Sequence, residues 1–458
     1  MSSSGTTSSP AAAQPRRLSF AALVTYGLPA TGTGFMYYLA ILYLLKFSTD
    51  VLLLAPAAVS AILGLSRVVD AFTDPLAGYL SDRTRSRLGR RRPWLIGSAV
   101  PIAIVFTLMW SPPEGLGEGP LLAWMAVTII GFYVLITAVN VPHQSWGAEL
   151  SPDYHERTRI FGARLLLLNL GAFGAVGCLM LITQAEEVRA SVFSLTAAVS
   201  AATAIAIIWS ATRLSERAEL QGRGPQAVLG AYRDILGNPH ARLLLLVFFI
   251  ESLGGATIGV LTPYMADYVI GNISFPLVVA TYMVAQTASV PIWAPLSRRF
   301  GKKTLWLFSM LVTSGGFGLF FFVGAGDVEM TFVLAALVGA AAGCGNTIAP
   351  SVQSDIVDYD EWKTGERKEG GYFAGFNFVQ KGAAGATIML TGFVLQFSGY
   401  VPNVEQTEAA QLAIRSLYAL FPLACYLIGA ILFLRFSLDE EAHGKIRSEL
   451  EARRAADV

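Results

Sequence analysis

The sequence predicts an all-α membrane protein with twelve transmembrane helices in two similar six-helix bundles. Three observations carry this prediction. The chain is 54% hydrophobic and only 14% charged, whereas soluble globular domains have a charged share of about 25%. Apolar stretches of about 20 residues, the length that crosses a hydrocarbon core of about 30 Å, recur along the whole chain. Two arginine-rich loops, one in each half, also resemble each other.

The apolar stretches follow one another with short polar connections. A segment that crosses lipid must satisfy its own backbone hydrogen bonds, and the chain lacks the alternating pattern of a membrane β-barrel, so each stretch is expected to be a helix. We place the twelve helices at residues 19–46, 51–80, 94–111, 120–146, 162–184, 190–212, 241–269, 273–297, 304–323, 330–355, 371–398 and 411–436.

The domain organisation follows from these stretches. Residues 1–17 form a Ser/Thr/Ala-rich tail that is expected to be disordered and lacks the apolar core of a cleavable signal peptide. The N-terminal six-helix bundle is predicted at 18–212 and the C-terminal bundle at 241–436. A central loop, 213–240, joins the bundles, and a C-terminal tail covers 437–458.

Lysine and arginine gather in alternate loops, whereas residues 111–120 and 324–330 contain neither. Positively charged loops remain in the cytoplasm when a membrane protein inserts. Both termini and the central loop are therefore expected to be cytoplasmic, in the inner or plasma membrane. The basic residues are Arg83, Arg85, Arg87, Arg90, Arg91 and Arg92 after the second stretch, Arg298, Arg299, Lys302 and Lys303 after the eighth, and Lys363, Arg367 and Lys368 after the tenth.

The two halves share a sequence repeat. The first arginine-rich loop reads G-Y-L-S-D-R-T-R-S-R-L-G-R-R-R-P-W from Gly78 to Trp94, and the second reads A-P-L-S-R-R-F-G-K-K-T-L-W from Ala294 to Trp306. Each follows the second stretch of its half. Parallel six-helix repeats are the architecture of major facilitator transporters, which bind solute between the halves near the bilayer midplane. The repeat therefore predicts that fold and a transport function.

Three charged residues lie inside the second stretch. Arg67, Asp70 and Asp74 are three and four residues apart, which puts them on one helical face. A charge at mid-membrane costs roughly 2.5 to 3.5 kcal/mol on insertion scales, so it usually marks a function. The two carboxylates can converge on a cation, their repulsion favours proton uptake, and Arg67 can partly neutralise them. The alternative is that these charges lie near a helix end and support the cytoplasmic loop.

A lysine lies inside the eleventh stretch. Lys381 precedes the small-residue run from Gly382 to Ala386, and small residues let helices approach closely. We expect this lysine to lie in a packed interface that faces the other half and to pair with Asp70 or Asp74. The alternative is a lysine that extends its ammonium group to the membrane edge.

Other polar residues inside the stretches are candidates for binding solute or cation. A lone histidine such as His143 is more often a hydrogen-bonded packing residue than a ligand, and the sequence does not decide whether Glu251 lines the cavity or supports a polar network. Lys46 and Asp267 lie near outer helix ends and are expected to be solvated. The candidates are Thr137, Asn140 and His143 in the fourth stretch, Arg164 in the fifth, Glu251 in the seventh and Asn346 in the tenth.

The charged segment at residues 355–370 is rich in carboxylates. Its acidic side chains are expected to pair with the first arginine-rich loop when the cytoplasmic side closes. The alternative is a solvated connector.

Several function classes are excluded. A formal net charge of +1 with arginines confined to short loops gives no reason to expect nucleic-acid binding. The three cysteines, Cys178, Cys344 and Cys425, are scattered without metal-ligand spacing. No nucleophile motif such as G-x-S-x-G is present. We therefore expect neither an enzyme nor a cofactor.

Motifs spread over nearly the whole chain resemble the glycoside-pentoside-hexuronide:cation symporter family of the major facilitator superfamily, which includes the melibiose permeases. They are Y-L-L-K-F-S-T-D-V (Tyr43 to Val51), R-V-V-D-A-F-T-D-P-L-A-G (Arg67 to Gly78), G-R-R-R-P-W, D-I-V-D-Y-D-E-W-K-T-G-E-R, the context of Lys381, and G-Y-V-P-N (Gly399 to Asn403).

The resemblance implies roles for individual residues. It implies that Asp70 and Asp74 form the cation site, that Thr137 supplies a further oxygen and that Lys381 belongs to a coupling network with Arg67. Asn140 is counted with both the cation and the solute ligands. The remaining solute ligands implied or considered are His143, Arg164, Asn346 and Lys381.

The chain also departs from the melibiose permeases. It has Thr33 and Gly34 where they have a Lys-Asp pair, Asn140 where they have an Asp, and Asn346 where they have a Trp. Sugar-clamping carboxylates are thus missing, and fewer charged oxygens weaken the case for Na⁺. The expected function is H⁺- or Na⁺-coupled symport of a sugar or glycoside, and the alternative is symport of a lysolipid or other amphiphile. By analogy with this fold, a monomer in the lipid bilayer is expected.

Overall fold

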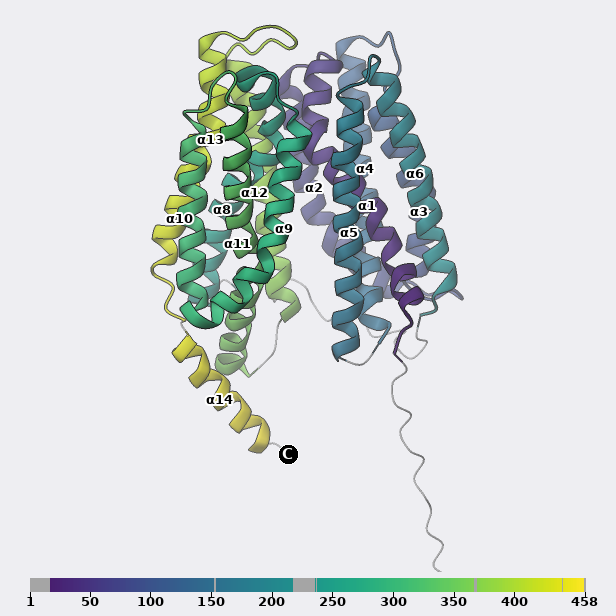
Figure 1. Cartoon of the computed structure of the whole chain (residues 1–458). Helices are drawn as coiled ribbons and strands as arrows, with labels where there is room; N and C mark the ends of the chain where they lie inside the picture. Colours follow the sequence, from purple (N-terminus) through teal and green to yellow (C-terminus); the bar gives the residue numbers. More distant parts are fainter. Residues whose placement is uncertain are drawn as a thin grey trace, which may run out of the picture.

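The computed structural model describes residues 17–151, 154–216, 235, 237–365, 369–438 and 440–456. In this part of the chain all regular structure is helical, as the sequence predicts, and Figure 1 shows two helix bundles side by side. The first bundle contains α1 (Phe20–Lys46), α2 (Pro56–Arg83), α3 (Arg92–Trp110), α4 (Glu118–Glu149), α5 (Tyr154–Ile182) and α6 (Val188–Arg213). The second contains α8 (Pro239–Met265), α9 (Phe275–Phe300), α10 (Lys302–Phe320), α11 (Val328–Thr364), α12 (Glu369–Phe397) and α13 (Glu408–Phe433).

Eleven helices of the described chain are long and apolar enough to cross a membrane. α10 lies outside that set because two lysines begin it and several Gly and Ser residues interrupt its apolar sequence. It nevertheless packs against α11 and α13 in the second bundle. We therefore count α10 as the twelfth spanning helix.

The internal repeat is visible in the packing of the helices. α2 packs on α4 and α3 on α6 in the first bundle, just as α9 packs on α11 and α10 on α13 in the second. Between the bundles, α2 contacts α12 and α5 contacts α9, which are again equivalent pairs with the halves exchanged. This arrangement follows from the two similar sequence halves.

The structure describes part of the segments outside the bundles. The predicted tail 1–17 lies outside the described residues except for Arg17, and so does most of the central loop, including 217–234. The predicted C-terminal tail contains a helix, α14 (Glu440–Ala456), that packs against α11. Its Ile446 and Leu450 are buried, so the helix is stabilised by apolar contacts as well as by its own hydrogen bonds.

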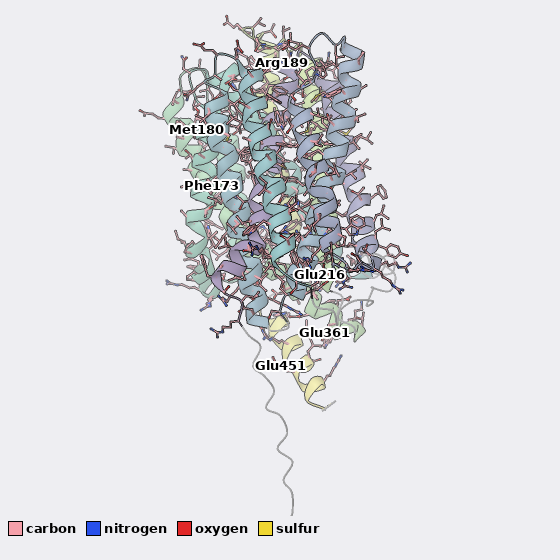
Figure 2. The ribbon with its side chains drawn as sticks, turned by 90° about the vertical axis from the view of Figure 1, so that its right-hand side faces the viewer. Phe173, Met180, Arg189, Glu216, Glu361 and Glu451 are labelled. Carbon is pink, nitrogen blue, oxygen red and sulfur yellow. The ribbon has the colours of Figure 1, made fainter. Side chains whose placement is uncertain are left out.

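The two ends of the molecule are distinct. Figure 2 places Arg189 at one end and Glu216, Glu361 and Glu451 at the other. The second of these ends also carries the beginning of α1, α14 and both arginine-rich loops, and we call it the arginine-rich end. We call the opposite end, where α1 and α8 finish, the far end.

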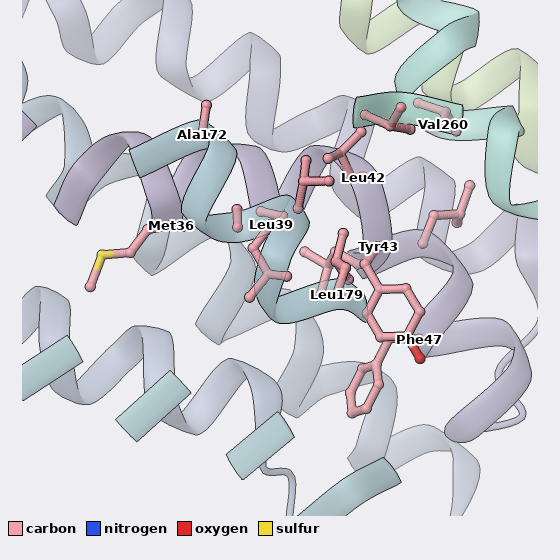
Figure 3. Close-up of a cluster of buried hydrophobic side chains, with 14 of the residues drawn as sticks. Met36, Leu39, Leu42, Tyr43, Phe47, Ala172, Leu179 and Val260 are labelled. Carbon is pink, nitrogen blue, oxygen red and sulfur yellow. The ribbon is translucent and has the colours of Figure 1, made fainter. Parts of the chain in front are cut away.

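Near the far end the bundles meet through apolar side chains. Leu42 and Tyr43 of α1 belong to the same buried cluster as Val260 of α8 (Figure 3). The ring of Tyr43 also stacks on Phe275 of α9, with the ring centroids 6.1 Å apart. Large aromatic side chains bury much area in such contacts. The far end is therefore closely packed between the two halves.

Candidate cation and solute site

Two carboxylates and one ammonium group meet between the bundles near the middle of α2. The Nζ atom of Lys381 lies 2.9 Å from Asp70 Oδ2 and 2.5 Å from Asp74 Oδ2. The hydroxyl of Thr137 donates to Asp70 Oδ1 at 2.6 Å, and its oxygen lies 3.0 Å from Asp74 Oδ1. We call Asp70, Asp74, Thr137 and Lys381 the central cluster. The sequence predicted both partners of the lysine.

Local sequence explains why these side chains converge. Asp70 and Asp74 are one helical turn apart on α2, and Thr137 comes from α4, which packs against α2. α12 can bring Lys381 close because Gly385, one turn further, lies against α2. A Cβ atom added at Gly385 would be 2.8 Å from the Cβ of Arg67. The small-residue run therefore provides the close approach that the sequence predicted.

The central cluster is open on one side. The side chain of Asp70 is only 3% exposed, whereas those of Asp74 and Lys381 are 31% and 25% exposed. Two carboxylates and one ammonium leave a formal charge of −1 in the cluster. A cation can therefore approach from the Asp74 side and bind carboxylate and hydroxyl oxygens, the ligands preferred by hard cations.

Arg67 makes its hydrogen bonds to tyrosines rather than to the carboxylates. Its guanidinium donates to the hydroxyls of Tyr133 at 2.7 Å and Tyr37 at 3.3 Å. It also lies over the ring of Tyr133, with the central carbon 4.1 Å from the centroid. Arg67 thus acts on Asp70 through space rather than by a hydrogen bond. Sequence reasoning missed both tyrosines, although Tyr133 lies one turn before Thr137 and could have been found from that spacing.

The polar residues of α4 lie in different surroundings. Asn140 is half-buried, and its Oδ1 accepts a hydrogen bond from the hydroxyl of Thr33 at 3.3 Å. His143 is fully buried, and its Nε2 lies 2.7 Å from the carbonyl oxygen of Tyr26. The hydroxyl of Tyr26 donates in return to the carbonyl of His143 at 3.0 Å. This geometry favours the packing alternative for His143.

The other candidates do not belong to the central cluster. Arg164 is 9% exposed, and its Nε has no hydrogen-bond partner within the described chain. Asn346 is exposed. Glu251 is half-buried in the second bundle and accepts a hydrogen bond from Trp306 Nε1 at 3.3 Å, which places it in a polar network of that bundle.

Two charged residues outside the central cluster, Lys46 and Asp355, form ion pairs. Lys46 is 7% exposed and pairs with Asp267 at 2.9 Å, so the expectation that Lys46 is solvated is wrong, whereas the side chain of Asp267 is 43% exposed, as expected. The reason is that the helix ends of the two halves cover each other there. Asp355, from the acidic segment, pairs with Lys302 of its own half at 2.7 Å.

The first arginine-rich loop also pairs within its own half. Arg90 Nη2 lies 2.7 Å from Glu149 Oε1, and Arg91 contacts both Asp82 and Glu149. Glu216 accepts hydrogen bonds from the successive backbone N–H groups of residues 90–92 at 2.7, 2.8 and 2.7 Å. The predicted pairing between this loop and the acidic segment of the other half remains a prediction for a state closed at this end.

No group of three or more His, Cys, Asp or Glu side chains that could hold a metal ion occurs among the residues that the structure describes. The central cluster has two carboxylates, a hydroxyl and an ammonium. This set suits a proton or a monovalent cation that exchanges readily.

Comparisons with known proteins show the family and the fold of the chain. A family model described as MFS/sugar transport protein matches residues 25–440. The chain is 24% identical to the glucuronide carrier protein homolog of Escherichia coli (strain K12), over 96% of this chain and 97% of that protein. It is 27% identical to the isoprimeverose transporter of Lactiplantibacillus pentosus, over 94% and 91%. The crystal structure of a D-xylose-proton symporter shares the fold, with a TM-score of 0.67 and 13% identity over 91% of this chain and 98% of that one.

Proposed function

The chain belongs to the MFS/sugar transport family, and from this premise we propose that it is a symporter that carries a sugar or glycoside together with H⁺ or Na⁺ by alternating access. It is a multi-pass membrane protein with the major facilitator fold. Its family consists of transporters rather than enzymes, and no cofactor besides the coupling cation enters the proposal.

The observation that carries the proposal is the bridge from Lys381 to Asp70 and Asp74. The lysine belongs to the second half and the carboxylates to the first, so the ion pairs tie the halves together near their middle. A proton or Na⁺ that binds the carboxylates competes with the ammonium group for the same charge. Cation binding would therefore release Lys381 and change the contact between the halves, which is the coupling that symport needs.

The two candidate coupling ions, H⁺ and Na⁺, make different demands on the central cluster. The formal charge of the cluster is −1, so one proton or one monovalent cation balances it. Na⁺ needs several oxygen ligands at once, whereas a proton needs one carboxylate oxygen. Asp70, Asp74, Thr137 and Asn140 are the proposed oxygen ligands if the ion is Na⁺.

The proposed solute site includes Arg164, Asn140 and Asn346, with Lys381 at its edge. Arg164 has no hydrogen bond to Nε, and no carboxylate pairs with it among the described residues. Its guanidinium can donate to sugar hydroxyls or to an acidic substituent. The names of the two relatives, a glucuronide carrier homolog and an isoprimeverose transporter, support a sugar-type solute. We therefore favour this class over an amphiphile.

The proposed orientation places the arginine-rich end in the cytoplasm of a cell whose inner or plasma membrane holds the protein. This follows from the distribution of lysine and arginine between loops. Both termini would then be cytoplasmic. One chain supplies both halves of the central cluster, so we propose that the monomer transports.

The first experiment is thermal unfolding of the purified protein with a panel of glycosides, free sugars, sugar acids and lysolipids, each with Na⁺, with Li⁺ or at several pH values. A ligand that binds the folded state raises its apparent stability. We expect a sugar-type compound to stabilise the protein more strongly in the presence of its coupling cation. Stabilisation by lysolipids alone would replace the sugar by an amphiphile, and a cation effect unaltered in Asp74→Asn would contradict the proposed site.

A further inference from the structure

The far ends of α1 and α8 have the same unusual local structure. α1 continues into a π-helical turn, η1 (Phe47–Val51), and α8 continues into another, η3 (Ala266–Ile270). The two helices are equivalent in the repeat. π-helical turns are rare and often occur at functional positions. One acidic residue lies in each turn, Asp50 in the first half and Asp267 in the second.

A buried lysine joins these acidic residues. Lys46 Nζ lies 2.7 Å from Asp50 Oδ2 and 2.9 Å from Asp267 Oδ2. It also lies over the ring of Tyr268, 4.5 Å from the centroid. The side chains of Lys46 and Asp50 are both only 8% exposed. A cation held by two carboxylates and an aromatic face is well compensated despite its burial.

Hydroxyl and amide groups of the second half surround Asp50. Tyr268 donates to Oδ2 at 2.6 Å and Tyr400 donates to Oδ1 at 2.5 Å. Asn403 Nδ2 donates to the backbone carbonyl of Asp50 at 2.7 Å. Burial, together with the nearby charge of Asp50, raises the pKa of Tyr400, which therefore keeps its proton and remains a donor.

We call Lys46, Asp50, Asp267, Tyr268 and Tyr400 the far-end cluster. Three of its members come from the second half and two from the first, so the contacts of Lys46 and Asp50 with Asp267, Tyr268 and Tyr400 exist only while the halves touch at this end. The adjoining Thr49–Tyr264 and Asp50–Asn403 hydrogen bonds add further polar contacts between the halves at this end.

Separation of the halves would remove these contacts but would also admit water. Asp50 would exchange two tyrosine donors for water, and Lys46 would exchange Asp267 for water. A polar group is costly when it is buried without a partner and much less so when water replaces the partner. The cluster can therefore break and re-form as a unit, unlike an apolar interface that must expose its whole area.

We propose that the far-end cluster holds the transporter closed at the far end, and that its strength sets the balance between the form open at the arginine-rich end and the form open at the far end. This inference rests on the proposed alternating-access function. It assigns Lys46 a positioning role that neither the central cluster nor the solute site requires.

The test measures opening directly and needs no solute. Val260 is 5% exposed between α8 and α1, about two helical turns before Asp267. The native cysteines are replaced by serine, Val260→Cys is introduced, and a membrane-impermeant maleimide is added to cells on the far-end side. Labelling should be slow in this parent. With Lys46→Ala it should be about tenfold faster, because loss of the buried ion pairs of Lys46 shifts the equilibrium toward the form open at the far end.

The matched control is Lys302→Ala. Lys302 also pairs with an aspartate, Asp355, but within one half and at the other end, so labelling should not change. Equal acceleration by both variants would overturn the proposal, since a general loosening would then explain the effect. Unchanged labelling in a folded Lys46→Ala protein would overturn it as well.

Two further variants keep the proposal testable if Lys46→Ala does not fold. Tyr400→Phe removes one donor and should raise the labelling rate by about threefold, within the usual range for one hydrogen bond; an unchanged rate in the folded protein would count against the cluster. Tyr268→Phe removes the donor to the other carboxylate oxygen of Asp50 and should raise the labelling rate by a similar factor; an unchanged rate in the folded protein would reject the idea. Failure here leaves symport itself untouched, because uptake and cation-dependent stability are measured separately.

Discussion

The molecule contains two clusters in which a lysine bridges two aspartates, and each joins the halves. In the central cluster, Lys381 binds Asp70 and Asp74, and the side chains of Lys381 and Asp74 are 25% and 31% exposed. In the far-end cluster, the side chains of Lys46 and Asp50 are 8% exposed and tyrosine hydroxyls surround the carboxylate. The chemistry is similar, but in the far-end cluster the lysine and Asp50 are enclosed, and Asp267, 43% exposed, is the carboxylate that water reaches.

This difference in exposure separates two roles, exchange of a cation with the solution and closure of the halves at one end. Where water reaches the carboxylates, a dissolved cation can replace the lysine, so the cluster can respond to a gradient. Where tyrosines fill the remaining acceptor positions, the lysine stays until the halves part. We therefore propose ion coupling for the central cluster and conformational balance for the far end.

The largest expected effect tests the exchange directly. Asp74→Asn removes the accessible negative charge of the central cluster, so gradient-driven uptake should fall to background while folded protein remains in the membrane. Uptake of radiolabelled solute into vesicles with an imposed Na⁺ or pH gradient measures this. Glu441→Gln, which breaks an exposed ion pair with Lys445 on α14, is the control and should transport normally. Undiminished uptake in Asp74→Asn would remove the central cluster from coupling.

Replacing the bridging lysine sharpens the same comparison. Lys381→Gln removes the internal competitor, so the carboxylates should bind the coupling cation about tenfold more tightly. The measurement is the cation concentration at which thermal stabilisation is half complete, which should decrease. If the ion is H⁺, the measurement is the pH midpoint of stabilisation, which should increase. Uncoupled transport is expected in parallel. A midpoint that stays in place would show that Lys381 does not compete with the ion.

The close approach of α12 to α2 gives a smaller effect. Gly385→Ala would place a Cβ atom 2.8 Å from Arg67 Cβ, and such overpacking costs about 1 to 3 kcal/mol. The melting temperature and the uptake rate should both decrease. Gly382→Ala is the matched control, because an added Cβ there has nothing within 4 Å. Similar losses in both variants would mean that helix contact at Gly385 does not position Lys381.

The smallest expected effect concerns the hydroxyl of Thr137. Thr137→Val keeps the shape of the side chain but removes the donor to Asp70, so the affinity for the coupling cation should fall by about fivefold, within the range for one hydrogen bond. Thr137→Ser should retain wild-type behaviour. The cation dependence of uptake distinguishes the two variants, and an equal loss in both would attribute the effect to packing.

The sequence by itself determined the spanning helices, the two-fold repeat and the positions of the charges inside the membrane. Each depends on local or periodic information: apolar length, the basic loops, and the three- and four-residue spacing of Arg67, Asp70 and Asp74. The partner choice of Lys381 could also be predicted, since a lysine inside a membrane needs a carboxylate and few are present.

Only the tertiary structure decided which charges are enclosed and which remain open. The helix-end position of Lys46 predicts a solvated side chain, yet the second half covers it, and Arg67 donates to Tyr37 and Tyr133 rather than to Asp70. His143 likewise joins the packing of the first bundle. Periodicity along one helix fixes the face on which a side chain lies. The exposure of that side chain depends on other helices, some of them hundreds of residues away in the sequence, which contact it only when the bundles pack.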